Sequence, residues 1–487
     1  MTRKTTHRTR YTLVFGALVS SLSTMALFGY SAPAADLPAF SAEDVFEMEY
    51  ANDPQVSPDG SRVAYVRSSM DIMTDRTRRT IWVVDIDGSG NRPLVSGAGN
   101  FSSPRWSPSG DRLAYLSNTE GKTQLFVQWL EGGETAKVTT LPQSPRSIVW
   151  SPDGKHIAFT RFVPAPPPTL ADMPAKPEGA KWAEPATVVD RMTFRFDGGG
   201  YLPTGNQQVF VVPADGGTPR QMTSGDYPIS GTVSWMPDSQ SIVFSSNRRE
   251  NVEYHPRQND LYAASITAGE LTQMTDHAGP EGNPAVSPNG RYLAYTSAAD
   301  TRQGYNRADL RVMDLTSGES RSLTADLDRS VSDIQWSADS KSVWIRYTDL
   351  GMARIAEVDL KGNLTRADVV LGGTALGRPY TSGTFSVGGK DRIAYTLGRD
   401  DRPADLALMR SGKQPLQLTD LNSDLMGQRE MSRVERMVWP SSHDSMEIEG
   451  WVMKPPGFDP EKQYPMILEI HGGPHSAYGP NYSVSYT

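Results

Sequence analysis

The stretch that decides the fold is SPDGSRVAYV at residues 57–66, a tight turn followed at once by an apolar strand. Pro58 stands at the second position of the turn and Gly60 at the fourth. This pattern is typical of a type I β-turn, because the proline ring presets the backbone angle that its position needs. The same turn and strand recur along the chain, so the stretch predicts a repeated structural unit.

The repeat occurs seven times at a nearly constant spacing. Its anchor positions are Ser57, Ser107, Ser151, Met236, Ser287, Ser337 and Ser386. The spacings between them are 50, 44, 85, 51, 50 and 49 residues, and without the long one their mean is about 49. A period in the forties is typical of β-propeller blades rather than of helical solenoids.

Each unit offers the segments that a four-stranded blade needs. A further apolar strand comes later in the unit, as at residues 81–84, 125–127 and 310–313, and a Leu-Thr strand such as 323–324 closes most units. These units predict a mainly β chain with a seven-bladed β-propeller over residues 36–430. Tryptophans at one phase of the repeat are expected in the blade cores: Trp106, Trp150, Trp235 and Trp336.

The spacing of 85 residues marks an insertion in the third unit. Two blades would fit this length, but seven prolines lie between residues 164 and 185, and proline cannot donate to a strand ladder. We therefore expect a Pro-rich insertion of about residues 163–206 between two strands of the third blade. Within it, Arg195, Asp197 and Tyr201 are candidates either for bracing the insertion or for touching a substrate.

The long connections of the repeat are predicted to share one face of the propeller. In a four-stranded meander the turns after strands one and three lie at one end, and the other connections lie at the opposite end. The variable segments 68–80, 246–260 and 297–309 all belong to the second set, together with the insertion. Binding residues usually lie on loops that a rigid scaffold positions, so this face is the candidate binding face.

One charged cluster on this face stands out. Arg248, Arg249 and Glu250 follow one another in the long connection of the fourth unit. The cluster has two interpretations, a solvated charged loop or the recognition of a peptide terminus by charge pairing.

Residues 1–35 have the features of a secretory signal peptide. The positive charges at its start are Arg3, Lys4, Arg8 and Arg10. Residues 13–28 are mostly apolar, and small residues at 32–34 suit cleavage. The alternative is an uncleaved membrane anchor. We expect export across the inner membrane to a bacterial periplasm, with no stable membrane span after cleavage.

Composition excludes several kinds of site and partner. The chain of 487 residues has no cysteine, which excludes disulfides, a thiolate nucleophile and Cys-ligated metals. It has 48 Lys and Arg against 56 Asp and Glu, a net charge of -8, which argues against nucleic acid as the partner. No cofactor is predicted, and a homo-oligomer is left open.

The last fifty residues depart from the repeat. Residues 434–439 and 448–453 are predicted strands, and MILEI at 466–470 is predicted to be a short buried strand. It runs into His-Gly-Gly-Pro-His at 471–475. An apolar strand followed by His-Gly-Gly is the oxyanion-loop arrangement of α/β-hydrolases, in which backbone N–H groups point at a developing oxyanion.

Three residues of this loop are the candidate oxyanion site. Gly472 and Gly473 are candidate oxyanion donors through their backbone N–H groups, and the alternative is a plain tight turn. His471 is interpreted as a positioning residue rather than as a catalytic base. No metal site is expected with His475, because Gly-Gly-Pro between the two histidines precludes the helix that would bring them to one face.

In this order, the motifs resemble the prolyl oligopeptidase family of serine peptidases, in particular its acylaminoacyl-peptidase and dipeptidyl-peptidase-like branch. The propeller repeat is followed by EIEGWVMKPPGFDP at 447–460 and YPMILEIHGGPHSAYGP at 464–480. RFDGGGY at 195–201 and KWAEP at 181–185 also resemble motifs of that branch. The resemblance covers nearly all of the chain after residue 35.

The resemblance implies a propeller that caps an α/β-hydrolase domain and restricts access to short peptides. It also implies acyl transfer by a Ser, Asp and His triad. The sequence contains no Gly-X-Ser-X-Gly motif, and the family places its triad after the position that Thr487 occupies. We therefore expect residues 431–487 to be the N-terminal fragment of the peptidase domain, and this chain alone to be inactive, either as a fragment or as a truncated relative. The alternative function is a non-catalytic periplasmic propeller that binds protein partners.

Overall fold

The computed structural model describes residues 37–172, 174–183, 186–389, 392–410, 413–473 and 475–486. Pro38–Thr487 form one compact unit. The predicted signal peptide at 1–35 lies outside the described residues, as do Glu184 and Pro185 of the KWAEP motif.

The strands follow one another in seven groups. Blade 1 contains β1 (Glu49–Val56), β2 (Arg62–Asp71), β3 (Arg76–Asp85) and β4 (Arg92–Val95), and blade 2 contains β5 (Phe101–Trp106), β6 (Arg112–Ser117), β7 (Gln124–Trp129) and β8 (Thr135–Lys137). Blade 3 contains β9 (Pro145–Trp150), β10 (His156–Pro164), β13 (Gly205–Pro213) and β14 (Arg220–Gln221). Blade 4 contains β15 (Ile229–Trp235), β16 (Ser241–Ser246), β17 (Asp260–Ser265) and β18 (Leu271–Gln273).

The remaining three blades also have four strands each. Blade 5 contains β19 (Glu281–Val286), β20 (Tyr292–Ser297), β21 (Asp309–Asp314) and β22 (Ser320–Ser322), and blade 6 contains β23 (Val331–Trp336), β24 (Ser342–Asp349), β25 (Met352–Asp359) and β26 (Leu364–Arg366). Blade 7 contains β27 (Phe385–Gly388), β28 (Arg392–Leu397), β29 (Asp405–Arg410) and β30 (Leu416–Gln417). Outside the blades lie η1 (Glu43–Glu47), β11 (Arg195–Phe196), β12 (Gly200–Tyr201), η2 (Val252–Tyr254), α1 (Ser423–Met426), β31 (Val434–Pro440) and β32 (Glu447–Met453).

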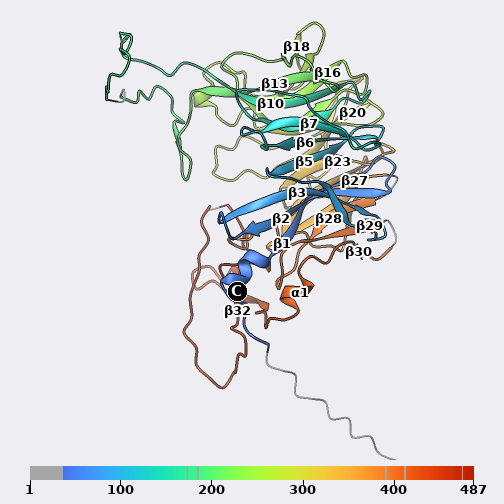
Figure 1. The fold of residues 1–487 in the computed structure, drawn as a ribbon, viewed down its shortest axis with the longest axis vertical. Helices are drawn as coiled ribbons and strands as arrows, with labels where there is room; N and C mark the ends of the chain where they lie inside the picture. The colour runs from blue at the N-terminus through green and yellow to red at the C-terminus, as the bar shows by residue number, and fades with distance from the viewer. Residues whose placement is uncertain are drawn as a thin grey trace, which may run out of the picture. The chain divides into compact units, whose positions relative to one another are not determined.

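Each blade is an antiparallel meander of four strands, with the strands of a blade in chain order. The predicted seven-bladed β-propeller is therefore confirmed (Figure 1). In blade 3, β10 pairs with β13 along its whole length, from His156 with Pro213 to Pro164 with Gly205. The segment 165–204 leaves the blade between these two strands and contains the small hairpin β11–β12.

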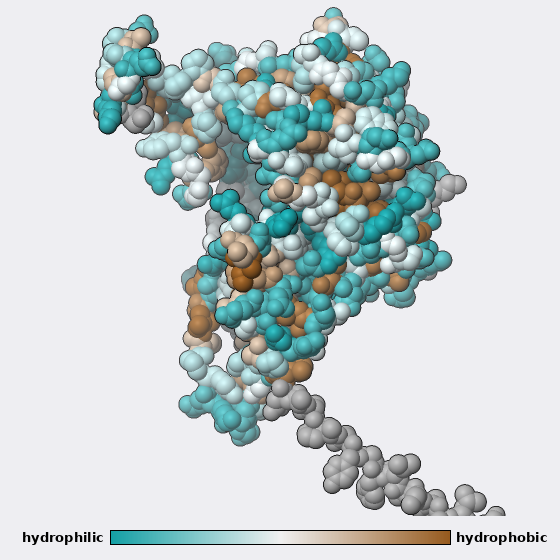
Figure 2. Space-filling view, in the orientation of Figure 1, coloured by the Kyte–Doolittle hydropathy of each residue, from teal (hydrophilic) through white to brown (hydrophobic). Residues whose placement is uncertain are grey.

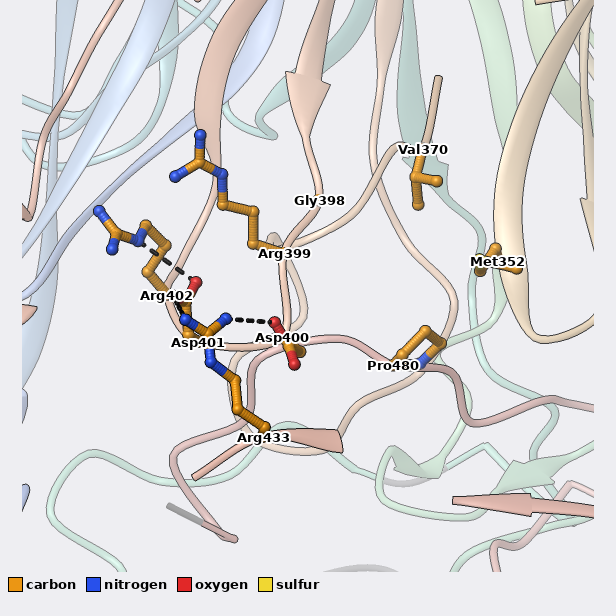
Figure 3. A pocket seen from close by; sticks show the side chains of 9 residues that line it. All are labelled: Met352, Val370, Gly398, Arg399, Asp400, Asp401, Arg402, Arg433 and Pro480. Atoms are coloured by element: carbon orange, nitrogen blue, oxygen red, sulfur yellow. Dashed lines mark hydrogen bonds and ion pairs between the residues drawn. The ribbon is translucent and has the colours of Figure 1, made fainter. Parts of the chain in front are cut away.

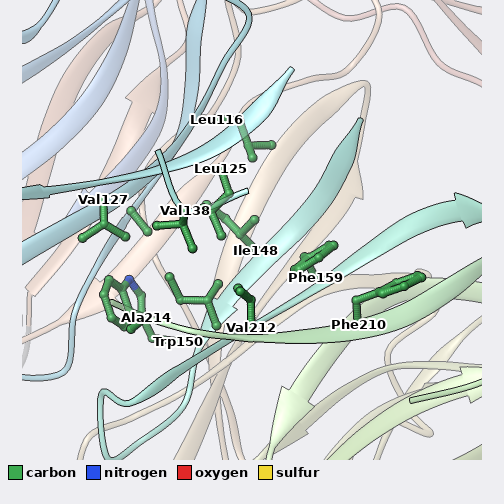
Figure 4. Packing of buried hydrophobic residues seen from close by; sticks show 12 residues of the cluster. Leu116, Leu125, Val127, Val138, Ile148, Trp150, Phe159, Phe210, Val212 and Ala214 are labelled. Carbon is green, nitrogen blue, oxygen red and sulfur yellow. The ribbon is translucent and has the colours of Figure 1, made fainter. Parts of the chain in front are cut away.

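The apolar core lies largely between neighbouring blades. Between blades 2 and 3, side chains of β6 and β7 pack against those of β9, β10 and β13, and the ring of Phe159 stacks on that of Phe210 with centroids 5.6 Å apart (Figure 4). We call the contact between two neighbouring blades a seam. Because successive side chains of a strand point to opposite faces of its sheet, every blade can bury one face in each of its two seams.

Each seam also has a hydrogen bond between a side chain and the backbone of the next blade. At four seams a tryptophan indole N–H donates to a carbonyl of the preceding blade: Trp106 to Gln55, Trp150 to Arg105, Trp235 to Val149 and Trp336 to Ala285. At the other three, a backbone N–H donates to a side-chain oxygen: Val286 to Ser234, Val387 to Gln335 and Val56 to Ser386. The recurring tryptophans thus join blades as well as filling them.

The Leu-Thr signature has a similar structural role. In blade 7 the Thr419 hydroxyl accepts the N–H of Leu406 at 2.9 Å and donates to Asp405 at 2.8 Å. Thr139 and Thr223 make the same two contacts in blades 2 and 3, with Gln124 and Gln208 in the place of Asp405. The threonine therefore fixes the outermost strand to the third strand of its blade.

The ring closes between blades 1 and 7 without sharing a strand, since β1 pairs with β2 and β30 pairs with β29. The seam is held by the bond from Val56 N–H to the Ser386 hydroxyl, at 3.0 Å, and by one from Ala51 N–H to Ala404 O, at 2.9 Å. An apolar cluster of both blades fills it, including Tyr65.

We call residues 431–486 the C-terminal segment. Among its described residues the one regular element is the hairpin β31–β32. The prediction that residues 466–470 form a buried strand is wrong. These residues have no strand assignment, and Ile467 is 92% exposed. Figure 2 shows brown, apolar side chains at the surface where the C-terminal segment lies in Figure 1. A buried strand needs hydrogen-bonding neighbours and covered faces, and no described strand lies beside this segment.

Candidate active-site region on the long-loop face

The C-terminal segment lies on one end of the propeller, the end that contains the connections between second and third strands and between successive blades. We call this end the long-loop face. Gly479 N–H donates to Pro379 O at 3.0 Å, and Tyr482 N–H donates to Arg399 O at 2.9 Å. Pro379 belongs to the connection between blades 6 and 7, and Arg399 to the connection between β28 and β29.

Close backbone approach holds this segment against blade 6. A Cβ atom at Gly479 would collide with the carbonyl oxygen of Gly351, and one at Gly351 would lie 2.6 Å from Tyr478 O. Gly351 also has a φ of +70°, a conformation that favours glycine. The indole N–H of Trp451, in β32, donates to Tyr478 O at 2.9 Å. Hairpin, propeller and the residues that follow the His-Gly-Gly loop therefore meet at one point.

Two tyrosine rings lie beside the candidate oxyanion loop and its His471 ring. Tyr380 and Tyr478 form an isolated β-bridge, and their rings meet edge to face with centroids 4.7 Å apart. The His471 ring lies 5.2 Å from that of Tyr478. Partial burial, together with the Tyr478 hydroxyl, raises the pKa of Tyr380 above its ordinary value.

The two glycines of the loop have their backbone exposed. The N–H of Gly472 faces the Tyr380 hydroxyl, and the N–H of Gly473 donates to no described residue. Gly473 has a φ of +147°, whereas a Cβ at Gly472 would meet nothing within 4 Å. The His471 Nδ1 atom lies 3.0 Å from Gly472 O. The loop therefore offers one donor that no described residue uses, at Gly473, and one at Gly472 that the Tyr380 hydroxyl contacts. The imidazole of His471 contacts the backbone of its own loop.

Glu469 and Arg378 form an ion pair beside this loop. The Tyr478 hydroxyl lies between them, 3.2 Å from the Arg378 guanidinium and 3.3 Å from the Glu469 carboxylate. The pKa of Arg378 is raised by its hydrogen bond with Tyr478 and by the Glu469 charge. Sequence reasoning missed Arg378 and Tyr380, because they lie in a connection between blades that has no motif of its own.

A charged cavity of about 610 Å³ opens where blade 7 meets the start of β31 (Figure 3). Arg433 bridges Asp400, at 3.1 Å, and Asp401, at 3.0 Å. Arg402 also contacts Asp401, at 3.3 Å, and Arg399 donates to Gln417 at 2.7 Å. The charged groups of the cavity are thus largely paired with one another. The two ion pairs of Arg433 join the last blade to the C-terminal segment.

The predicted cluster at 248–250 separates into three different environments. Arg249 pairs with the fully buried Asp260 at 3.1 Å and with Asp276 at 2.7 Å. Burial raises the pKa of Asp260 despite this partner. Arg248 pairs with no described carboxylate and stacks on two tyrosine rings. Glu250 is exposed.

The candidates of the insertion lie on its hairpin. Arg195 faces Tyr201 in the β11–β12 register, Asp197 lies in the turn, and all three residues are exposed. The insertion is anchored just before this hairpin, where Arg191 pairs with Asp226 at 2.9 Å. Among the described residues, none of these side chains contacts the loop at 471–473.

Comparisons with known proteins bear on this arrangement. Residues 36–163 match the family model described as TolB beta propeller domain, and residues 181–302 match that of the dipeptidyl peptidase IV N-terminal region. The chain is 29% identical over 461 residues to the uncharacterized peptidase YuxL of Bacillus subtilis, covering 91% of this chain and 67% of YuxL. It is 25% identical over 437 residues to dipeptidyl-peptidase 5 of Porphyromonas gingivalis, covering 86% of this chain and 61% of the relative.

The structure adds a likeness in fold. It matches the acylaminoacyl peptidase of Pyrococcus horikoshii with a TM-score of 0.70 and 19% identity, over 91% of this chain and 64% of that one. The two family models and these relatives fit the prolyl oligopeptidase family. Both curated relatives are named as peptidases, which agrees with the predicted class of hydrolase.

The chain spans 67% and 61% of the lengths of these two curated relatives. In the part of the chain that the structure describes, no helix has the length and apolar character needed to cross a membrane.

Proposed function

We propose that this chain is the N-terminal portion of an exported serine peptidase of the prolyl oligopeptidase family, which hydrolyses short peptides by acyl transfer. The observation that supports this most is the His471–Gly473 loop, which lies on the long-loop face with both glycines exposed. The Gly473 N–H is used by no described residue, and the Gly472 N–H contacts only the Tyr380 hydroxyl among them. In this proposal the propeller restricts access to the reacting bond, and the triad is supplied by residues that follow Thr487.

The loop would act on the tetrahedral intermediate. When a serine oxygen attacks the peptide carbonyl, the C=O bond opens and its oxygen becomes negatively charged. The N–H of Gly473 would donate to that oxyanion, and the N–H of Gly472 would exchange the Tyr380 hydroxyl for it. These bonds would stabilise the oxyanion more than the ground-state carbonyl. His471 would hold the loop through its contact with Gly472 O, and Tyr478 and Tyr380 would hold it against the propeller.

A matched pair of variants tests the role of Gly472 in the full product of the gene. Gly472→Ala keeps the N–H, and the added methyl group meets no atom within 4 Å, so activity should change little. Gly472→Pro removes the N–H and should lower kcat by about 10²- to 10³-fold. Equal activity of the two variants, with unchanged melting temperatures, would remove Gly472 from the oxyanion site.

Fluorophosphonate labelling tests the location of the nucleophile. We expect the 487-residue chain to remain unlabelled and the full gene product to be labelled on a serine after residue 487. Labelling of the shorter chain would show that its nucleophile lies within these residues. If the full product is also unlabelled, a non-catalytic propeller that binds protein partners becomes the better account.

Export is a separate part of the proposal. The positively charged start, apolar segment and small residues of 1–35 support it. N-terminal sequencing of the protein from the periplasmic fraction should give a start near residue 36. A protein that retains Met1, or that remains in the cytoplasmic fraction, would contradict export with cleavage.

A further inference from the structure

Arg248 and Arg249 are adjacent in the chain and have opposite surroundings. Two carboxylates and the carbonyl of His277 surround the guanidinium of Arg249. The guanidinium of Arg248 instead lies 4.7 Å from the ring centroid of Tyr227 and 5.5 Å from that of Tyr262. Its positive charge therefore has aromatic neighbours and no described carboxylate within ion-pair distance.

Other stacked arginines of the propeller show what is unusual here. Three of them combine a ring with a carboxylate: Arg67 with Trp82 and Glu49, Arg112 with Trp150 and Asp215, and Arg291 with Tyr292 and Asp314. Arg161, over Phe210, shares the lack of an acid with Arg248, but it lies within strand β10. Arg248 lies in the connection after β16, on the long-loop face.

The surroundings of Arg248 hold its guanidinium in place. Tyr262 is 6% exposed and belongs to the core between blades 3 and 4, whereas Tyr227 is 38% exposed. The backbone of Tyr227 accepts a hydrogen bond from the buried Gln208 side chain. The Nε atom of Arg248 is buried without a hydrogen-bond partner, and burial lowers the pKa of the group.

A partly buried guanidinium without an acid is incompletely compensated, because it has lost water without gaining an opposite charge. Stacking fixes its plane, and a fixed guanidinium binds a carboxylate in a bidentate manner at a low entropic cost. The exposed ring of Tyr227 lies beside it and can contact the carbon atoms that bear the carboxylate.

We propose that Arg248, with Tyr227 and Tyr262, binds a carboxylate group of the peptide on the long-loop face. This inference rests on the proposed function for the identity of the ligand as a peptide. The carboxylate could be the C-terminus or the side chain of an Asp or Glu residue. The proposal assigns the recognition of a peptide carboxylate, which the sequence suggested for the whole 248–250 cluster, to Arg248 alone. Arg249 is already paired with two carboxylates.

Binding by the 487-residue chain tests the site without any need for hydrolysis. Three fluorescent tripeptides of neutral sequence differ only in charge: a free C-terminal acid, its amide, and an amide with one Glu side chain. We expect the free acid or the Glu amide to bind about tenfold more tightly than the neutral amide, and the tighter of the two identifies the carboxylate.

Variants assign the preference to Arg248. Arg248→Gln should abolish it, and Arg248→Lys should retain part of it, because lysine keeps the charge but loses the bidentate geometry. Arg291→Gln is the matched control, a stacked arginine with an acid partner, and should leave the preference unchanged. Absence of a preference, or its survival in Arg248→Gln, would overturn the proposal. A preference that depends on Arg248 in a gene product without hydrolytic activity would keep the site and overturn the proposed peptidase.

Discussion

Strand β10 and residues 466–470 are both rich in apolar side chains, but their environments are opposite. In β10, Ile157 and Phe159 are fully buried, whereas Ile467 and Ile470 are 92% and 80% exposed. The first run has β9 on one side, β13 on the other and blade 2 against one face. The second has no described strand beside it. Apolar character thus favours burial in both places, but only neighbouring strands can satisfy the backbone while the side chains are buried.

The largest expected effect comes from emptying the seam between blades 2 and 3. Phe159→Ala removes a fully buried ring that stacks on Phe210, so the free energy of unfolding should fall by about 3–5 kcal/mol. Urea unfolding followed by tryptophan fluorescence measures this. A loss below about 1 kcal/mol would mean that the seam collapses around the cavity and is not tightly packed.

A smaller effect is expected from removing one hydrogen bond between blades. Trp235→Phe keeps an aromatic ring in the core but removes the indole N–H that reaches Val149 O at 3.1 Å, which should cost about 1 kcal/mol. Trp439→Phe is the control in the C-terminal segment, since that side chain is 41% exposed. Equal losses from both variants would show that the bond between blades contributes nothing specific.

Buried and exposed carboxylates should differ in the sign of their pH dependence. Burial raises the pKa of Asp405 in the folded protein, so its contribution to stability is present at low pH and is lost as the pH rises through the folded pKa. Asp405→Asn should therefore be more favourable, relative to the parent protein, at pH 7 than at pH 4. Gln124 and Gln208 show that an amide fits this position in other blades.

The turn residue Asp59 provides the opposite case. Hydrogen bonds from Ser57 and Ser61 lower the pKa of Asp59 to about 2, so its contribution is present above the unfolded value of 3.8 and is lost as the pH falls. Asp59→Asn should be less favourable at pH 7 than at pH 2. Melting temperatures across this range test both variants, and slopes of the same sign would contradict the assigned causes.

The smallest effect is expected at the exposed apolar run. Ile467→Ser should change the free energy of unfolding of the 487-residue chain by less than about 0.5 kcal/mol, because the exposed isoleucine side chain has no core contact to lose. A loss comparable to that of Phe159→Ala would show that this run is buried in solution.

Sequence reasoning predicts the local parts of this fold well and the long-range parts poorly. The turn and strand at 57–66 lie within ten residues, so their pattern is legible in one stretch. The bond from Trp235 to Val149 joins residues 86 positions apart, and only the packing of two blades aligns them. The strand expected at 466–470 was wrong for the related reason that its pattern says nothing about which neighbours are present.

The candidate site divides in the same way. The glycines of the His-Gly-Gly loop could be proposed as oxyanion donors from the adjacent residues alone, and this role is still a prediction for experiment. The neutralisation of Arg249 by Asp276 depends on a carboxylate 27 positions away, so sequence alone left Arg248 and Arg249 equivalent. Arg378 and Tyr380 are candidates because the C-terminal segment packs on the connection between blades 6 and 7, a contact that no local sequence pattern indicates.

The closure of the ring without a shared strand has a consequence for the order of folding. Each of the seven seams has a bond between a side chain and a backbone group. Six of these join residues 45 to 86 positions apart, whereas the bond from Val56 to Ser386 joins residues 330 positions apart. The entropy lost in closing a loop grows with its length, and contacts of large sequence separation form slowly. We therefore expect each blade to assemble on its predecessor as the chain is synthesised, with the seam between blades 1 and 7 as the last to form.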